Sequence, residues 1–274
     1  MEIIEMIGDW TNEWMNQRGG GNNWDWDHTN STFQDYYNRY GLDLYPTSGD
    51  YQIQNQHTNS KKVYQTTYGP NDYPSEATFQ HTYTQEDTFS WSLEEKLSYG
   101  KDVSIGVVAP DIFTASTGRR FEISLTTTQE QKRSDKTEWS QQQTFHVPQN
   151  EKVAVEMIVE EVEANATKDV SVVATGSVAA GLNRKWNGHY FWFLPIGELA
   201  SEFSTHPGVK VKNSHKVEFT TKLDMSGTAG VNSRIRIKSE DQAGKEAESP
   251  RTVNHIQHPD QLLVGAQTQK PSAD

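Results

Sequence analysis

The stretch VSIGVVAPDIFTASTG, Val103–Gly118, decides how this chain is interpreted. Apolar residues at the odd positions from Val103 to Val107 alternate with serine and glycine, which is the period of a β-strand with two unlike faces. Apolar residues then surround Pro110, where a turn is ordinarily polar. The stretch therefore predicts an amphipathic β-hairpin with an apolar tip.

The alternation extends over two arms, from Leu97 to Leu125. The odd-numbered face and the tip form the candidate lipid-facing set: Leu97, Tyr99, Val103, Ile105, Val107, Val108, Ile112, Phe113, Ala115, Phe121, Ile123 and Leu125. The small or polar even-numbered face forms the candidate pore lumen: Ser98, Gly100, Asp102, Ser104, Gly106, Thr114, Ser116, Gly118, Glu122 and Ser124. Each arm has about 12 residues, and a tilted transmembrane strand needs about 9–11.

A three-residue loop at residues 110–112 keeps the two odd faces together. It pairs Val107 with Ala115 and Val103 with Arg119, whereas a two-residue turn would mix the faces. The simpler alternative is that the odd face covers a protein core, as in most half-buried antiparallel strands. Lys101 and Arg119 favour this alternative, because both charges fall on the proposed lipid face. The small even face, the apolar tip and the long polar strands that follow favour a barrel.

Composition limits the remaining possibilities. Only 33% of the 274 residues are apolar and the mean hydropathy is -0.82, which fits a thin, elongated β protein with little core. The net charge of -12 argues against nucleic acid and against adsorption to anionic lipid by charge alone. The chain has no cysteine, so disulfides and thiolate metal sites are excluded. The first residues have no basic, apolar pattern, which predicts no signal peptide.

The spacing of apolar residues changes along the chain, from a helical period to the period of a strand. Apolar residues from Ile3 to Trp14 fall on one helical stripe, and Ser31 with Gln34 forms a capping box for a second short helix. From about Lys61 the chain alternates with period two, and residues 151–163 are assigned to a strand. We expect a helical, aromatic-rich head over 1–60 with 184–208, a β body over 61–183 and 209–244 that contains the hairpin 97–125, and a tail over 245–274.

Three stretches in order resemble one family, the aerolysin-like β-pore-forming proteins, in the branch with epsilon toxin, mosquitocidal toxins and parasporins. They are the Ser/Thr-rich strands that flank the hairpin, TFHVPQNEKVAVEMIV (144–159) and FTTKLDMSGTAGVNSRIRIKSED (219–241). The resemblance covers about residues 60–240. It implies an elongated β-sheet and sandwich fold and a soluble monomer that binds a receptor on a target-cell membrane. It also implies a ring-shaped homo-oligomer that inserts one hairpin per protomer.

The family also suggests a site for each remaining step. The candidate receptor-binding residues are the head aromatics Trp24, Trp26, Tyr36, Tyr37, Tyr40, Tyr190 and Trp192, and the receptor would be a glycan or an anchored protein. A small aromatic core is the alternative for these residues. The tail after Lys245 or Arg251 is a candidate activation peptide. Such proteins are extracellular, released by lysis or stored as crystals, and no separate lectin domain is visible.

No catalytic fingerprint, cofactor motif or metal spacing occurs in the sequence, and we expect neither an enzyme nor a metal protein. The segment Asp25–His28 and the pair His255 and His258 lack the spacing of known cation sites. Two functions remain: a pore-forming cytolysin, and a non-lytic glycan-binding or storage protein on the same scaffold.

Overall fold

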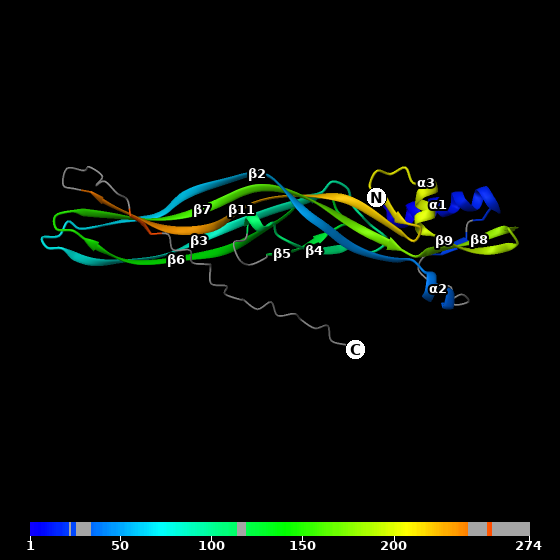
Figure 1. Cartoon of the computed structure of the whole chain (residues 1–274), viewed down its shortest axis with the longest axis horizontal. Coiled ribbons are helices and arrows are strands. Elements are labelled where there is room, and N and C mark those ends of the chain that lie inside the picture. Colours follow the sequence, from blue (N-terminus) through cyan, green and yellow to red (C-terminus); the bar gives the residue numbers. More distant parts are fainter. Residues whose placement is uncertain (22, 26–33, 114–118, 241–250, 254–274) are drawn as a thin grey trace.

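A computed structural model describes residues 1–21, 23–25, 34–113, 119–240 and 251–253 of the chain. The molecule is a long, narrow antiparallel β protein with helices gathered at one end (Figure 1). Strand makes up 66% and helix 15% of the structure, which confirms the mainly β fold. Within the described residues, no helix has both the length and the apolar composition needed to cross a membrane.

The elements follow the order that the sequence texture predicted. The helices are α1 (Ile3–Arg18), α2 (Gln34–Tyr40) and α3 (Ile196–Phe203), with a 3-10 turn η2 (Asp111–Phe113). The strands are β1 (Asn23–Asp25), β2 (Asp43–Tyr68), β3 (Ser75–Leu93), β4 (Ser104–Val108), β5 (Arg120–Ser124), β6 (Gln131–Val147), β7 (Lys152–Thr175), β8 (Ser177–Trp186), β9 (His189–Pro195), β10 (Val209–Asn213), β11 (Lys216–Glu240) and β12 (Arg251–Val253).

Three long strands, β2, β7 and β11, lie side by side along the body. β7 lies between β2 and β11 and pairs with β11 from Thr175↔Lys216 to Lys152↔Glu240. β7 has 24 residues, so this sheet is about 80 Å long. The strand texture begins at Asp43 and not at Lys61, because residues 43–60 already add an edge strand along β7. The predicted head–body boundary at residue 60 therefore falls within β2.

β3 and β6 form the second layer of the body. They pair without interruption from Ser75↔Val147 to Trp91↔Gln131. β3 joins β11 only over Thr88–Leu93 and then diverges from it. Beyond that point Phe79 and Trp139 pack against Met157 and its neighbours on β7, forming a narrow apolar core between the layers. The outer face of β3 and β6 is polar, which explains the low apolar content of the chain.

The head is built around α1. The predicted helical stripe is buried, and the Trp10 ring stacks on Phe219 at a centroid distance of 6.1 Å. α1 packs against α3 and β8, and β8 lies between β1 and β9 in a small sheet. This helical end lies beside the end of β3 from which the hairpin starts (Figure 1).

Candidate functional site

The hairpin is folded back along its own flanking strands. After β3 the chain reaches the head, where the Leu97 amide donates to the Leu125 carbonyl at 2.6 Å and Ser98 bridges Glu2. β4 and β5 then return along the body (Figure 1). The Phe121 ring lies 5.2 Å from Phe89 of β3, between ring centroids. The hairpin thus packs on the strand that leads into it.

Most odd-numbered side chains of the hairpin point into this contact, whereas Lys101 is exposed. Those that are buried are Leu97, Val103, Ile105, Val107, Phe113, Phe121, Ile123 and Leu125. Tyr99 and Ile112 are half-buried against the same core, Val108 is exposed, and Ala115 lies outside the described residues. The two-faced pattern therefore serves as core packing in this state, as the simpler alternative expected.

The even-numbered side chains face solvent. Gly100, Asp102, Ser104, Gly106 and Glu122 are exposed, and Ser98 and Ser124 are half-exposed. Thr114, Ser116 and Gly118 lie outside the described residues. Apart from Val108, which is also exposed, the outward face carries polar side chains and glycine, which is the composition expected of a lumen.

The predicted hairpin register is wrong for this structure. Val107 pairs with Phe121 and not with Ala115, and Val108 pairs with Arg120. Each strand has five residues, and the loop is longer than Pro110–Ile112. The reason is that the tip makes its own contacts: Phe113 is buried, and the Ala109 amide donates to the Arg119 carbonyl at 2.6 Å. The alternation survives, because odd residues still pair with odd.

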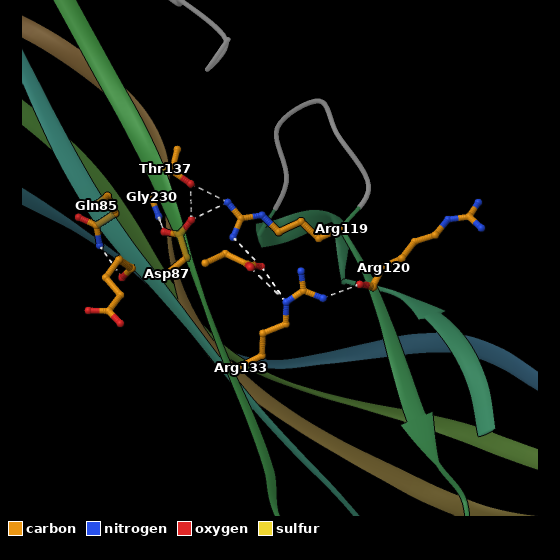
Figure 2. Close-up of polar contacts among 9 residues, drawn as sticks. Gln85, Asp87, Arg119, Arg120, Arg133, Thr137 and Gly230 are labelled. Carbon is orange, nitrogen blue, oxygen red and sulfur yellow. Dashed lines mark hydrogen bonds and ion pairs between the residues drawn. The ribbon is translucent and has the colours of Figure 1, made fainter. Parts of the chain in front are cut away.

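A buried carboxylate anchors the tip of the hairpin to the body (Figure 2). Asp87 on β3 is fully buried, and Arg119 Nη2 donates to its Oδ2 at 2.5 Å. Thr137 Oγ1 of β6 donates to the same oxygen at 2.6 Å, and the Gly230 amide of β11 donates to Oδ1 at 2.8 Å. Three strands and the hairpin thus meet at one carboxylate, which we call the tip anchor (Asp87, Arg119, Thr137 and Gly230).

A second pair of charges supports the tip anchor. Arg133 Nε contacts Asp135 at 3.1 Å, and Arg133 Nη1 donates to the Arg120 carbonyl at 3.0 Å. The Arg120 side chain points away from the cluster into solvent (Figure 2). Because removing one partner of a buried ion pair leaves an uncompensated charge, breaking the tip anchor is costly.

The sequence carried a signal for the tip anchor that pattern reading did not use. Asp87 and Arg119 both have odd numbers, the parity of the apolar residues Phe89 and Trp91 after Asp87 and of Phe121 and Ile123 after Arg119. Arg119 conflicted with a lipid-facing surface, and its partner explains its presence in the folded-back state. When two opposite charges occupy positions whose neighbours of the same parity are apolar and buried, they indicate a buried ion pair.

The head aromatics divide into a core and a surface. Tyr36, Tyr40 and Tyr190 are 55%, 47% and 53% exposed. Tyr37 is buried with its ring edge against Phe193, so it is withdrawn from the candidate receptor surface. Trp24 and Trp192 are half-buried, and Trp26 lies outside the described residues.

Phe193 of β9 organises the exposed rings. The Tyr36 ring stacks on it at 5.8 Å, and Tyr40 approaches it at 6.1 Å. Trp192 instead joins Trp186 at 4.8 Å on the side of α1. The exposed pair that gathers on Phe193 (Tyr36 and Tyr40), which we call the tyrosine surface, is what remains of the predicted receptor site. Tyr190 is exposed as well, but on β9 it has the opposite parity to Phe193, so it is not part of this surface.

No metal site emerges from the part of the chain that the structure describes, since no three His, Asp or Glu residues gather there. Of the segment Asp25–His28 only Asp25 is described, and His255 and His258 lie outside the described residues.

No family model and no curated relative matches the sequence. Three solved structures match over nearly the whole chain. The Cry23Aa1–Cry37Aa1 binary complex has a matching chain that is 17% identical, with a TM-score of 0.64 over 93% of this chain and 96% of that one. A non-toxic crystal protein from Bacillus thuringiensis is 14% identical, with a TM-score of 0.65 over 88% and 97%.

The third structure is the Mpp75Aa1.1 β-pore-forming protein from Brevibacillus laterosporus. It is 10% identical, with a TM-score of 0.61 over 93% of this chain and 95% of that one. At these identities the likeness establishes the architecture, and it confirms the resemblance found in the sequence at that level. The chain has the elongated, mainly β fold of the aerolysin-like β-pore-forming proteins.

Proposed function

We propose that this chain is a β-pore-forming protein whose hairpin, residues 97–125, inserts into a target membrane. The observation that carries the proposal is the folded-back hairpin. It buries eight apolar side chains of its odd-numbered face, presents a polar face to solvent, and sits on a fold shared with a β-pore-forming protein. In the folded-back state the apolar face packs on the body and the polar face contacts water. In the pore state the same apolar face would contact lipid and the same polar face would line the lumen.

The energetics require that release of the hairpin be coupled to a membrane. Exposing eight buried apolar side chains to water costs on the order of 15 kcal/mol, at about 1.5–3 kcal/mol each. The hairpin is therefore not released freely in solution. Transfer from the body core to lipid exchanges one apolar environment for another, so most of this cost is avoided at a membrane.

Assembly into a closed ring follows from the same physics. Unpaired strand edges are not tolerated in hydrocarbon, so an inserted hairpin must pair with hairpins from neighbouring copies. Insertion and oligomerisation are thus one coupled step. The pore state would be a homo-oligomeric barrel in the target-cell membrane, and the soluble form would act outside the producing cell.

Receptor binding is assigned to the tyrosine surface. Tyrosine rings that are half-exposed and stacked on an ordered neighbour provide a rigid surface for sugar rings or for another protein. The net charge of -12 makes charge attraction to anionic lipid an unfavourable route, which favours a specific receptor.

The proposal also includes proteolytic activation before assembly. β12 (Arg251–Val253) pairs with Ile235–Ile237 of β11 and so adds to the edge of that strand. Cleavage after Lys245 would release residues 246–274 and cleavage after Arg251 would release residues 252–274, and either cut would free this edge for another chain.

A second function has one observation in its favour. A protein described as a non-toxic crystal protein has the same fold, so the architecture also suits a non-lytic storage or glycan-binding role. No enzymatic activity is proposed for either alternative.

Release of a self-quenched dye separates the two functions. Vesicles prepared from erythrocyte and intestinal brush-border membranes supply receptors, and pure phosphatidylcholine vesicles serve as the receptor-free control. A pore-forming protein releases the dye from receptor-bearing vesicles and forms oligomers there. Protein that binds these vesicles and leaves the dye inside would contradict the pore and favour the non-lytic alternative.

A further inference from the structure

The hairpin and its flanking strands are out of register with one another. In the β3–β6 ladder every pair from Ser75↔Val147 to Trp91↔Gln131 follows one register. Continued without a break, that register would place Asp102 opposite Arg120 and the turn at residues 110–112. In the structure Arg120 lies opposite Val108, six residues further along. The two ladders therefore do not belong to one continuous hairpin.

The connections between the ladders account for the offset. Between the last β3–β6 pair, Trp91↔Gln131, and the first β4–β5 pair, Ser104↔Ser124, the outgoing side has twelve residues, 92–103, and the returning side has six, 125–130. The six additional residues lie on the outgoing side, where Ser98 bridges Glu2 at the head. The folded-back state thus holds β4 displaced along β5 relative to the flanking ladder.

The parity of the side chains is the same in both ladders. Odd residues are buried on β3 and β6, as Phe89 and Trp139 show, and odd residues are buried on β4 and β5. An offset of six is even, so correcting it exchanges partners without turning any side chain to the other face. A single two-faced hairpin from Ser75 to Val147 is therefore compatible with the sequence.

We propose that pore formation, if the function assigned above is correct, slides β4 along β5 by six residues into the β3–β6 register. Every residue from 92 to 109 then faces one from 113 to 130, compared with the five pairs of β4 and β5 in the folded-back state. The new register places Asp102 opposite Arg120 on the even face. The same face of the flanking ladder already holds one such opposite-charge pair, Glu86↔Lys136.

The offset in register prevents the hairpin from extending before the folded-back contacts break. Pairing cannot extend from the β3–β6 ladder into the hairpin until the β4–β5 hydrogen bonds break. The tip anchor must also open, because Arg119 moves away from Asp87 when the hairpin extends. A barrel that formed in the register of the folded-back state would need an unpaired bulge of six residues in the outgoing arm of every protomer.

Pairs of cysteines distinguish the two registers, since the chain has none of its own. Gly106→Cys with Glu122→Cys reports the folded-back register, because these residues are directly opposite. Asp102→Cys with Arg120→Cys reports the proposed one. Six residues separate the alternatives by about 20 Å, and a disulfide needs Cα atoms within about 7 Å. Thr84→Cys with Glu138→Cys, opposite on β3 and β6, is the control expected to link in both states.

All six positions are exposed, so the variants are expected to fold. In solution the 106/122 and 84/138 pairs oxidise and the 102/120 pair does not. Oxidised 106/122 protein binds receptor-bearing vesicles but releases dye about tenfold or more slowly, and a reductant restores the rate. In membrane oligomers formed from reduced protein, mild oxidation links 102 to 120, as read by mass spectrometry of the linked peptides. Mixing the two single variants detects links between protomers.

Each outcome decides one question. Linkage of 102 to 120 in leaking oligomers supports the register change. Linkage of 106 to 122 in leaking oligomers, or full leakage by the oxidised 106/122 protein, overturns the register change and leaves the pore intact. Absence of dye release by the unsubstituted chain from vesicles that it binds overturns the pore itself.

Discussion

Replacing Arg119 by glutamine (Arg119→Gln) removes the cation that neutralises Asp87 in the tip anchor. Breaking a buried ion pair by removing one partner costs about 3–5 kcal/mol. Asp87 keeps its hydrogen bonds from Thr137 and Gly230, and Arg119 is itself 21% exposed, so we expect the lower end, about 3 kcal/mol. Because Arg119 holds the hairpin and the other three members hold the body, the loss falls mainly on closure of the hairpin.

A cost of about 3 kcal/mol corresponds to roughly a hundredfold increase in the population of the open hairpin. Hydrogen exchange of peptides within residues 97–125 measures this population directly, and these amides should exchange roughly a hundredfold faster than in the unsubstituted chain. Peptides from β7 should be unchanged. Arg120→Gln is the matched control for exchange in solution, because the Arg120 side chain is exposed and points away from the tip anchor.

The same substitution should accelerate dye release from receptor-bearing vesicles, since the anchor must open before the hairpin extends. Equal exchange of residues 97–125 in the Arg119→Gln and Arg120→Gln proteins would refute the reasoning. So would an increase in exchange that is uniform over the whole molecule, because it would show that the anchor stabilises the body and not the hairpin.

Three further predictions test the other parts of the proposal. A polarity-sensitive dye on Ile105→Cys should report lipid in the pore and one on Ser104→Cys should report water, and two equally aqueous signals would exclude insertion of this arm. Tyr36→Ala with Tyr40→Ala should weaken binding to cells without changing the circular dichroism spectrum, and unchanged binding would place the receptor site elsewhere. Phe121→Ala should lower the free energy of unfolding by about 3–5 kcal/mol in urea, whereas Val108→Ala, at an exposed position, should change it by less than about 0.5 kcal/mol. Equal effects of these two substitutions would contradict the packing of the hairpin.

The elements that the sequence predicted well are those whose pattern repeats many times. The stripe of α1 and the alternation along β3, β4 and β5 reflect burial on one face, which follows the period of the side chains. The assignment of residues 151–163 to a strand is also correct, although glutamate and methionine favour helix there and residues 153–159 are buried on both faces of β7. The same pattern also identified both faces of the hairpin.

Only the tertiary structure shows what each of the two faces of the hairpin contacts. Period-two alternation is the same whether the odd face contacts lipid or protein. Only the folded-back path of residues 94–113 and 119–130 shows that this face contacts β3 in this state. The register could not be read from alternation either, because a shift of six residues preserves it. The pairing of Asp87 with Arg119 joins residues 32 positions apart through a contact that no local pattern encodes. Local periodicity therefore determined the strands and their faces, whereas long-range packing determined their register, their partners and the anchor that holds the hairpin closed.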